Sequence, residues 1–424
     1  MISVIIITFV SFQVVAWQII QSAKFEENLC VFRLILYHKY VKIKLTANLG
    51  KECLERGIDM KTVTGRSTKR DVGKAIEEAV SKISDVPVLI IFSADEENFS
   101  EYSILLSSRF PQSIVVGSTS YIHMCEQGYS KEGICLTAIS DIKCCGGVIE
   151  EAGRFPGKYI DRFKADVSKI SDRENGVCFE LCALTYYCEE LFLDRLHHIL
   201  KERNIPLFGG SAGSVKSKGS AVISYNGKVY TEAVAYIFLY GQFRLHFYKE
   251  NIFKPMKHQY VVTDAEVSER IVYEYNNVPA ARIIAKALGT DIVSLQSVLA
   301  EHPMGRMVDN DIYITDHIGV VQDEGLKYYA TVYNNTRVVM LEADDYKKVF
   351  QETMKNIYDK TGIPDFAVVI NCVSRSIRFE NDSYLPEYYS GLKNGFGSFI
   401  CFSGYGEQLN NHLNQTMVIA TFSN

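Results

Sequence analysis

Apolar runs alternate with amphipathic segments along most of the chain, and the order in which they occur repeats three times. Short runs rich in β-branched and aromatic residues predict buried strands, whereas apolar residues three and four positions apart predict helices. Each copy predicts a strand, a helix, a second strand ending in a turn of small residues, and a third strand. The copies span residues 88–139, 177–239 and 366–422. The pattern therefore predicts an α/β protein with mixed sheets, built from repeated β-α-β-β units.

The turn that ends the second strand of each copy is the first candidate for binding. These turns contain Ser118 and Thr119 in the first copy, Gly209, Gly210 and Ser211 in the second, and Gly404, Tyr405, Gly406 and Glu407 in the third. Ligands collect at strand ends in α/β sheets, so we expect the three turns to converge on a small polar ligand. The third turn should lie closest, because Asn414 follows it. A loop that bonds only to itself stays open as the alternative.

The remaining pattern places other elements around these copies. We expect helices at residues 68–84, 99–110, 184–203, 278–288, 344–359 and 382–392, the first of them capped by Thr68 and Asp71. Residues 146–164 suggest a glycine-punctuated connector, and residues 240–260 a strand that returns across the N-terminal unit. Strands at 312–319, 328–332 and 337–342 predict an antiparallel insertion. The expected domains are residues 60–272 and 273–424.

Residues 1–59 differ from the rest of the chain. Residues 2–20 are apolar enough to resemble a membrane anchor, and the basic residues between 33 and 44 would place the following side in the cytoplasm. Alternatively the segment is not translated, because residues 55–60 can be encoded by a purine-rich run followed by ATG, as at a bacterial ribosome-binding site. We favour a misplaced start and expect membrane contact only if residues 1–21 are translated.

The amino-acid composition indicates which kinds of molecule the protein is expected to bind. The chain has 424 residues, 47% of them apolar, and a formal charge of −5. Because no cluster of lysine and arginine is interleaved with aromatic residues, we expect no nucleic-acid partner. The eleven cysteines form no CxxC pair, and Cys178 and Cys401 lie inside apolar runs, which indicates buried thiols in a reducing compartment. No histidine or cysteine spacing is typical of a zinc site, so we expect neither a metal nor another cofactor.

Two residues could act as nucleophiles. Ser211 lies in a G-x-S-x-G sequence, but the sequence predicts a hairpin around Asn226 and Gly227 after it, not the helix that a nucleophile elbow requires. Cys372 ends a strand close to Arg375, a cation that would lower its thiol pKa. A hydrolase would need either residue near a histidine, and a buried strand-end thiol is the favoured interpretation of Cys372.

Arg375 and Glu407 follow the first and second strands of the third copy. If those strands are neighbours, both side chains lie at the same sheet end. A guanidinium binds a carboxylate through two hydrogen bonds, and a carboxylate accepts an ammonium group, so the two would suit an amino acid. A structural ion pair between them is the alternative.

The chain resembles the FIST family from about residue 60 onward. The sequence from Pro206 to Gly213, followed by residues 225–230, resembles the end of a FIST N-terminal domain. The FIST C-terminal pattern runs through the motifs His302-Pro303-Met304-Gly305, Cys372-Val373-Ser374-Arg375, Gly404-Tyr405-Gly406-Glu407 and Asn414-Gln415-Thr416. One departure is that Tyr121 to His123 stand where the family often has a small residue and then glutamate.

The resemblance implies an intracellular signal-sensing protein that binds small molecules, including amino acids. We therefore expect a cytoplasmic, non-enzymatic sensor that signals to a partner protein in trans. The alternatives are a cysteine- or serine-dependent hydrolase and an interaction scaffold without a ligand.

Overall fold

Each of the three copies forms the same unit in the computed structural model, which describes residues 60–184, 189–217, 220–308 and 311–424. In every copy the first strand lies between the other two, parallel to the second and antiparallel to the third. The strands are β2 (Leu89–Ala94), β3 (Ile114–Thr119) and β6 (Ile134–Ser140); β8 (Asn175–Ala183), β9 (Leu207–Ser211) and β12 (Ala233–Gly241); and β22 (Phe366–Cys372), β23 (Ser398–Gly404) and β26 (Thr416–Ser423). The predicted mixed α/β class is confirmed.

A fourth strand extends each sheet beyond its third strand. These strands are β1 (Lys61–Ser67) beside β6, β7 (Lys143–Glu150) beside β12, and β13 (Arg244–Asn251) beside β26. Two predictions were wrong here. Residues 146–150 belong to a strand, not to a connector, and β13 joins the third copy instead of returning across the N-terminal unit. Periodicity identifies a strand but does not specify its partner.

A hairpin from another copy completes each sheet at the opposite edge. The hairpin of the first copy, β4 (His123–Cys125) and β5 (Gly128–Ser130), pairs with β23; that of the second, β10 (Ile223–Tyr225) and β11 (Lys228–Tyr230), pairs with β3; and that of the third, β24 (Gly406–Leu409) and β25 (Asn411–Leu413), pairs with β9. Asn226 and Gly227 take φ of +48° and +82°, which confirms the predicted tight turn between β10 and β11. The exchange is cyclic and interlocks the three copies.

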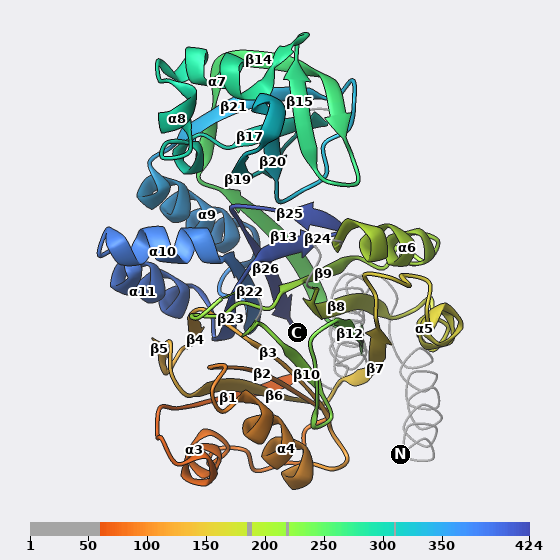
Figure 1. Ribbon diagram of the computed structural model, residues 1–424. Helices are drawn as coiled ribbons and strands as arrows, with labels where there is room; N and C mark the ends of the chain where they lie inside the picture. Colours follow the sequence, from red (N-terminus) through yellow and green to blue (C-terminus); the bar gives the residue numbers. More distant parts are fainter. Residues whose placement is uncertain (1–59, 185–188, 218–219, 309–310) are drawn as a thin grey trace, which may run out of the picture. The chain divides into compact units, whose positions relative to one another are not determined.

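Helices cover the outer face of each sheet (Figure 1). They are α3 (Val72–Ala79) and α4 (Phe99–Arg109) on the first, α5 (Ile160–Val167) and α6 (Glu189–Lys201) on the second, and α9 (Tyr346–Thr361), α10 (Val373–Asn381) and α11 (Leu385–Gly395) on the third. The first helix begins at Val72 because Asp71, not Thr68, caps it by accepting from the Lys74 amide. The segment 373–395 forms two helices where one was expected, and α10 begins directly after β22.

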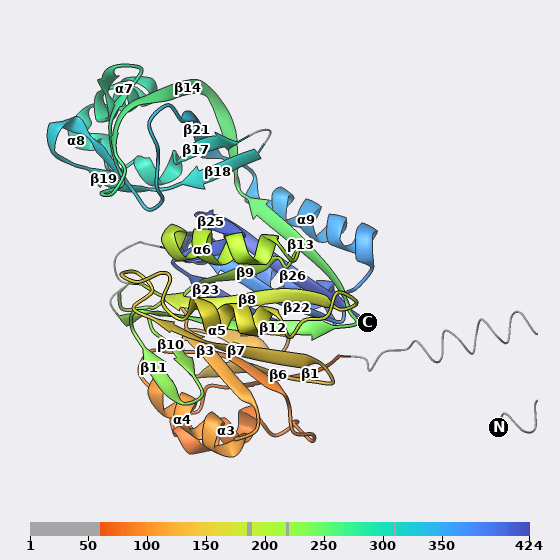
Figure 2. The same ribbon diagram turned by 90° about the vertical axis from the view of Figure 1, so that its right-hand side faces the viewer.

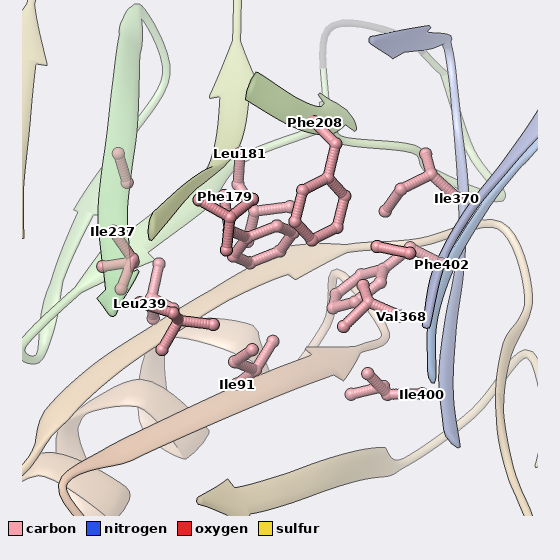
Figure 3. Packing of buried hydrophobic residues seen from close by; sticks show 14 of the residues in the cluster. Ile91, Phe179, Leu181, Phe208, Ile237, Leu239, Val368, Ile370, Ile400 and Phe402 are labelled. Atoms are coloured by element: carbon pink, nitrogen blue, oxygen red, sulfur yellow. The ribbon is translucent and has the colours of Figure 1, made fainter. Parts of the chain in front are cut away.

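The inner faces of the three sheets pack on one another in a common core. Phe179, Phe208 and Phe402 lie near its centre and are almost wholly buried (Figure 3). Burial of each phenylalanine side chain contributes about 1.5–3 kcal/mol. Because every copy supplies part of this core, no copy can bury its inner face alone.

The insertion between β13 and α9 is antiparallel throughout. It contains β14 (Phe253–Glu266), β15 (Ile271–Tyr275), β16 (Val278–Pro279), α7 (Ala280–Leu288), α8 (Ile292–Leu295), β17 (Met304–Val308), β18 (Asp311–Thr315), β19 (His317–Val320), β20 (Leu326–Tyr328) and β21 (Arg337–Ala343). Figure 2 shows the long strand β14 curving around it. We call residues 253–343 the inserted domain.

Two predicted strands of the inserted domain differ from the structure. Residues 312–319 form two strands that break at Asp316, and the strand expected at 328–332 ends at Tyr328. The described residues belong to one compact unit, and the predicted domain boundaries stay a prediction. None of their helices has the length and apolar character needed to cross a membrane. The expected leader at residues 1–59 lies outside the described part of the chain.

Candidate functional site

The three small-residue turns meet, as expected from their equivalent places in the copies. A backbone hydrogen bond joins each turn to the next, so that the three bonds form a cycle. The bonds run from Tyr121 N to Ser403 O (3.0 Å), from Tyr405 N to Ser211 O (3.3 Å) and from Gly213 N to Thr119 O (3.0 Å). The junction is therefore made by the backbone itself.

Glycines at this junction serve close backbone packing. A Cβ atom on Gly213 would lie 2.1 Å from the Ser403 carbonyl oxygen, and one on Gly404 would lie 2.0 Å from the Ser211 carbonyl oxygen. A Cβ atom on Gly210 would instead meet a side chain, at 2.5 Å from Cγ2 of Ile370. Here the backbone of another copy takes the place that we expected a ligand to occupy.

A cavity of about 150 Å³ lies beside the junction, at the ends of β22 and β23. It is lined by Asp316, Tyr329, Cys372, Val373, Ser374, Tyr405, Asn414 and Gln415. We call it the α10 cavity. The sequence singled out Cys372, Tyr405 and Asn414, and the structure brings these three together. Ser118, Thr119, Gly209, Gly210 and Ser211 are not among the lining residues.

One wall of the α10 cavity is the start of a helix. Cys372 is the N-cap of α10, and Val373 and Ser374 form the first helical positions. The amides of a first turn have no carbonyl partner within the helix, and the helix dipole gives this end a partial positive charge. The wall is suited to bind a carboxylate or another small anion.

Another part of the lining comes from the inserted domain. Asp316 lies between β18 and β19; its Oδ1 accepts from the amide of His317 (2.9 Å) and its Oδ2 from Nε2 of Gln415 (2.8 Å). Burial raises the pKa of Asp316 to about 7. A carboxyl group with this pKa can bind a cation at neutral pH. A nearby ammonium group favours the ionised form of the carboxyl group and forms an ion pair with it.

Glu407 is wholly buried behind the lining residues. Its Oε2 accepts from the amide of Thr416 (3.0 Å), whereas its Oε1 has no hydrogen-bond partner among the described residues. Burial raises the pKa of Glu407 to about 8, so the side chain is mainly neutral at pH 7. Of these two carboxyl groups, only that of Asp316 belongs to a residue that lines the cavity.

Arg375 points away from the α10 cavity. Its guanidinium is wholly buried, forms an ion pair with Glu250 and donates from Nε to Oδ1 of Asn371 (2.9 Å). Arg375, expected to bind the ligand, is not among the residues that line the cavity. The alternative, an ion pair with Glu407, is not formed either, because β13 brings Glu250 to this place. The strand partner of β13 could not be predicted from the sequence. Arg375 holds α10 against the third sheet.

The two candidate nucleophiles lack the settings that their chemistry needs. Burial and the neighbouring Glu407 raise the pKa of the Cys372 thiol far above its usual value, so it is not ionised. The described residues between β9 and β10 contain no α-helix after Ser211. The amides of Ala212 and Gly213 donate to Cys182 O (2.7 Å) and Thr119 O (3.0 Å) and do not form an oxyanion hole.

Sequence reasoning missed Asp316, Gln415 and the first turn of α10. Asp316 did carry a signal, since it interrupts the apolar run that we interpreted as one strand at 312–319. Gln415 takes a φ of +53° just before β26, which aims its side chain toward the inserted domain. No set of three or more His, Cys, Asp or Glu side chains in the described parts of the chain is placed to hold a metal ion.

Comparison with protein families gives two matches in tandem. A model described as the FIST N domain matches residues 87–277, and one described as the FIST C domain matches residues 280–410. The chain belongs to the FIST family. FIST domains are associated with signal transduction and with the sensing of small ligands. Six of the eight residues that line the α10 cavity lie within the FIST C match, and Asn414 and Gln415 lie four and five residues after its end.

One curated relative of this FIST protein is the uncharacterized protein MJ1623 of Methanocaldococcus jannaschii. It is 22% identical over 323 residues, which cover 70% of this chain and 59% of the relative. The chain thus spans about three-fifths of that relative's length. Among solved structures, a chorismatase crystal structure matches 86% of this chain and 98% of its own at 9% identity, with a TM-score of 0.33. At that score the likeness carries no argument.

Proposed function

We propose that this FIST protein is a cytoplasmic sensor that binds a small amino acid in the α10 cavity. The observation that carries the proposal is the pairing of two complementary walls. The start of α10, at Cys372, Val373 and Ser374, lines the cavity together with Asp316 of the inserted domain. The ligand carboxylate would accept from Val373 and Ser374, and its ammonium group would donate to Asp316.

Size supports a small ligand. A cavity of about 150 Å³ has the volume of one known to hold benzene, that is, roughly six non-hydrogen atoms. Glycine, alanine and serine are of this size. Two larger hollows are present. One, of about 680 Å³, is lined by residues that include Gly176 and Arg203. The other, of about 540 Å³, is lined by residues that include Lys164 and His198. They lack the convergent buried polar groups of the α10 cavity, and for this reason we place the ligand in the smaller space.

The cavity also offers a route for the signal. Its walls belong to the third copy and to the inserted domain, which contact each other through polar pairs such as Asp316 with Gln415 and Arg378 with Glu301. A ligand that bonds to both walls strengthens this contact and changes the surface shown to a partner protein in trans. The eight described cysteines are free thiols, which supports a reducing, cytoplasmic location.

Binding without catalysis is part of the proposal. The un-ionised Cys372 thiol and the occupied amides after Ser211 favour a sensor over a cysteine- or serine-dependent hydrolase. The α10 cavity itself favours a sensor over a scaffold without a ligand.

A thermal-shift screen of the full chain tests the proposal. Alanine should raise the melting temperature more than propionate or ethylamine, each of which lacks one of its two charged groups. A ligand at about one hundred times its Kd adds about 2.7 kcal/mol of stability. Asp316→Asn should remove the alanine shift, whereas Asp323→Asn, an exposed aspartate of the same domain, should leave it unchanged. Equal shifts with all three compounds, or no shift for any small amino acid, would contradict the proposal.

A further inference from the structure

A second group of buried polar side chains lies across strand β24 from the α10 cavity. Its members share the outer face of the second sheet, beneath the start of α6. They are Glu180 and Cys182 on β8, Glu189 on α6, Ser211 on β9, Gln408 on β24 and His412 on β25. We call this group the Glu180 cluster. Nothing in the proposed function uses it.

Ser211 lies at the middle of the Glu180 cluster. Its Oγ lies 3.3 Å from Sγ of Cys182, 3.4 Å from Oε1 of Glu189 and 3.4 Å from Nε2 of Gln408. Three strands and a helix therefore direct their polar groups toward one place, which is buried from solvent.

Two glycines of paired strands make room for these groups. A Cβ atom on Gly209 would lie 1.9 Å from the Glu180 carbonyl oxygen and 2.7 Å from its Oε1. One on Gly406 would lie 2.4 Å from Cε1 of His412 and 3.3 Å from Oγ of Ser211. Because Gly209 pairs with Gln408 in the β9–β24 ladder, Glu180 and Gln408 stand on either side of a position without a side chain.

Several atoms of the cluster lack partners. Within the described residues, no hydrogen bond reaches either carboxyl oxygen of Glu180, Oε1 of Gln408 or Nδ1 of His412. Glu180 and Gln408 are wholly buried, and His412 is 3% exposed. Buried polar atoms in native structures nearly always have a partner, so these atoms indicate a missing group.

The chemistry of the missing group follows from the atoms that lack partners. When Glu180 is ionised, three of them are oxygens that accept. Only Nδ1 of His412 can then donate, since Nε2 of His412 accepts from Nδ2 of Asn414 (3.1 Å). A group rich in N–H donors satisfies such a set. Glu180 and Glu189 add negative charge when ionised, and burial together with Glu189 raises the pKa of Glu180 well above its usual value. A bound cation would reverse that effect.

We infer that the Glu180 cluster binds a small organic cation of the primary-ammonium type, with its N–H groups donating to Glu180 and Gln408. A metal ion fits less well, since no three acidic, histidine or cysteine side chains of the described chain are placed to ligate one. The site is separate from the α10 cavity and does not depend on the proposed function. The hydrogen bond between Asn414, which lines that cavity, and His412 is a direct link between the two sites.

A thermal-shift titration of the full chain with methylammonium chloride tests the inference. Tetramethylammonium chloride at the same ionic strength is the control, because it carries the same charge without any N–H donor. Methylammonium in large excess over its Kd should raise the melting temperature by about 2 °C or more, and tetramethylammonium should not. Glu180→Gln should lose the shift. If that variant does not fold, Gln408→Met, which removes one acceptor, should show the same loss.

Asp316→Asn separates this site from the α10 cavity and should keep the methylammonium shift. A shift lost in Asp316→Asn would place the cation in the cavity and overturn the inference. So would equal shifts with both salts, no shift with methylammonium, or a shift that persists in both Glu180→Gln and Gln408→Met. Without any methylammonium shift, buried water would be the missing group. A shift that persists in both variants would place the cation elsewhere.

Discussion

The first and third copies share a fold but end their first strands differently. In the first copy Asp95 follows β2, and its carboxylate accepts from the amides of Glu97 (3.0 Å), Asn98 (3.0 Å) and Gly133 (2.6 Å). Cys372 occupies the equivalent place in the third copy, and α10 begins directly after it. Cys372 is the N-cap of this helix, and its side chain forms no capping hydrogen bond. The first copy thus supplies its own anion, whereas the first residues of α10 in the third copy line a cavity.

This difference shows how a repeated unit gains a binding site without a new fold. A carboxylate inside the first copy and a ligand carboxylate at the third would satisfy the same kind of amide group. The insertion adds the second wall through Asp316, which has no counterpart in the other copies.

The largest effect is expected at the residue that fixes α10. Arg375→Ala leaves Glu250 buried without its cation and should lower the free energy of unfolding by about 3–5 kcal/mol. Arg378→Ala is the matched control, because its pair with Glu301 is partly exposed and should contribute about 0–1 kcal/mol. Urea denaturation of both variants measures the difference. Equal losses would mean that the buried pair does not anchor the helix.

A smaller effect is expected when one amide is removed from the cavity wall. Val373→Pro deletes the N–H at the first helical position, where proline is tolerated, and Cys372 already has the extended conformation that precedes proline. Alanine affinity should fall about tenfold, since a hydrogen bond to a charged group contributes roughly 1.5–3 kcal/mol. Val373→Ala should bind normally in the same calorimetric titration. A normal affinity in Val373→Pro would exclude the helix start as the carboxylate site.

Glu407 should reveal its buried neutral state through pH. Its pKa in the folded chain is about 8, above the unfolded value, so wild-type stability falls as pH rises from about 4.5 to 8. Glu407→Gln keeps an acceptor for Thr416 and removes the titration. Relative to wild type, the variant should gain about 1 kcal/mol or more between pH 5 and pH 8. Parallel pH profiles in urea denaturation would show that Glu407 is ionised in the fold.

The smallest effect is expected at the turn of the second copy. Ser211→Ala should change alanine affinity by no more than a few-fold, because Ser211 does not line the α10 cavity. Wild-type protein should show no turnover of ester or amide substrates in a steady-state assay. A hydrolytic rate that disappears in Ser211→Ala or Cys372→Ala would replace the sensor by a hydrolase.

Sequence patterning predicted the local elements of this fold better than their partners. The strand Phe366–Cys372 and the small-residue turns follow from apolar runs and glycines, which are properties of neighbouring residues. The cyclic exchange of hairpins and the pairing of β13 with β26 depend on contacts between residues far apart in the chain. Periodicity carries no information about these contacts.

The residues of the candidate site likewise fall into those that local sequence predicts and those that depend on distant contacts. Cys372, Tyr405 and Asn414 were predicted because they stand near strand ends and glycine turns. Asp316 was missed because it reaches the cavity from another domain, and Arg375 was misplaced because its partner Glu250 lies 125 residues away. A charged residue beside a strand end shows that a charge is present, but the fold decides which atom it meets.

The most direct test of the account is the pH dependence of alanine binding, measured by calorimetry on wild type and Asp316→Asn. Asp316, with a pKa of about 7, must be ionised to hold the ammonium group. Wild-type affinity should therefore rise about tenfold between pH 6 and pH 8. Asp316→Asn should bind weakly and equally at both pH values. If wild type shows no change with pH, or Asp316→Asn keeps the wild-type affinity, the ligand does not bridge α10 and the inserted domain.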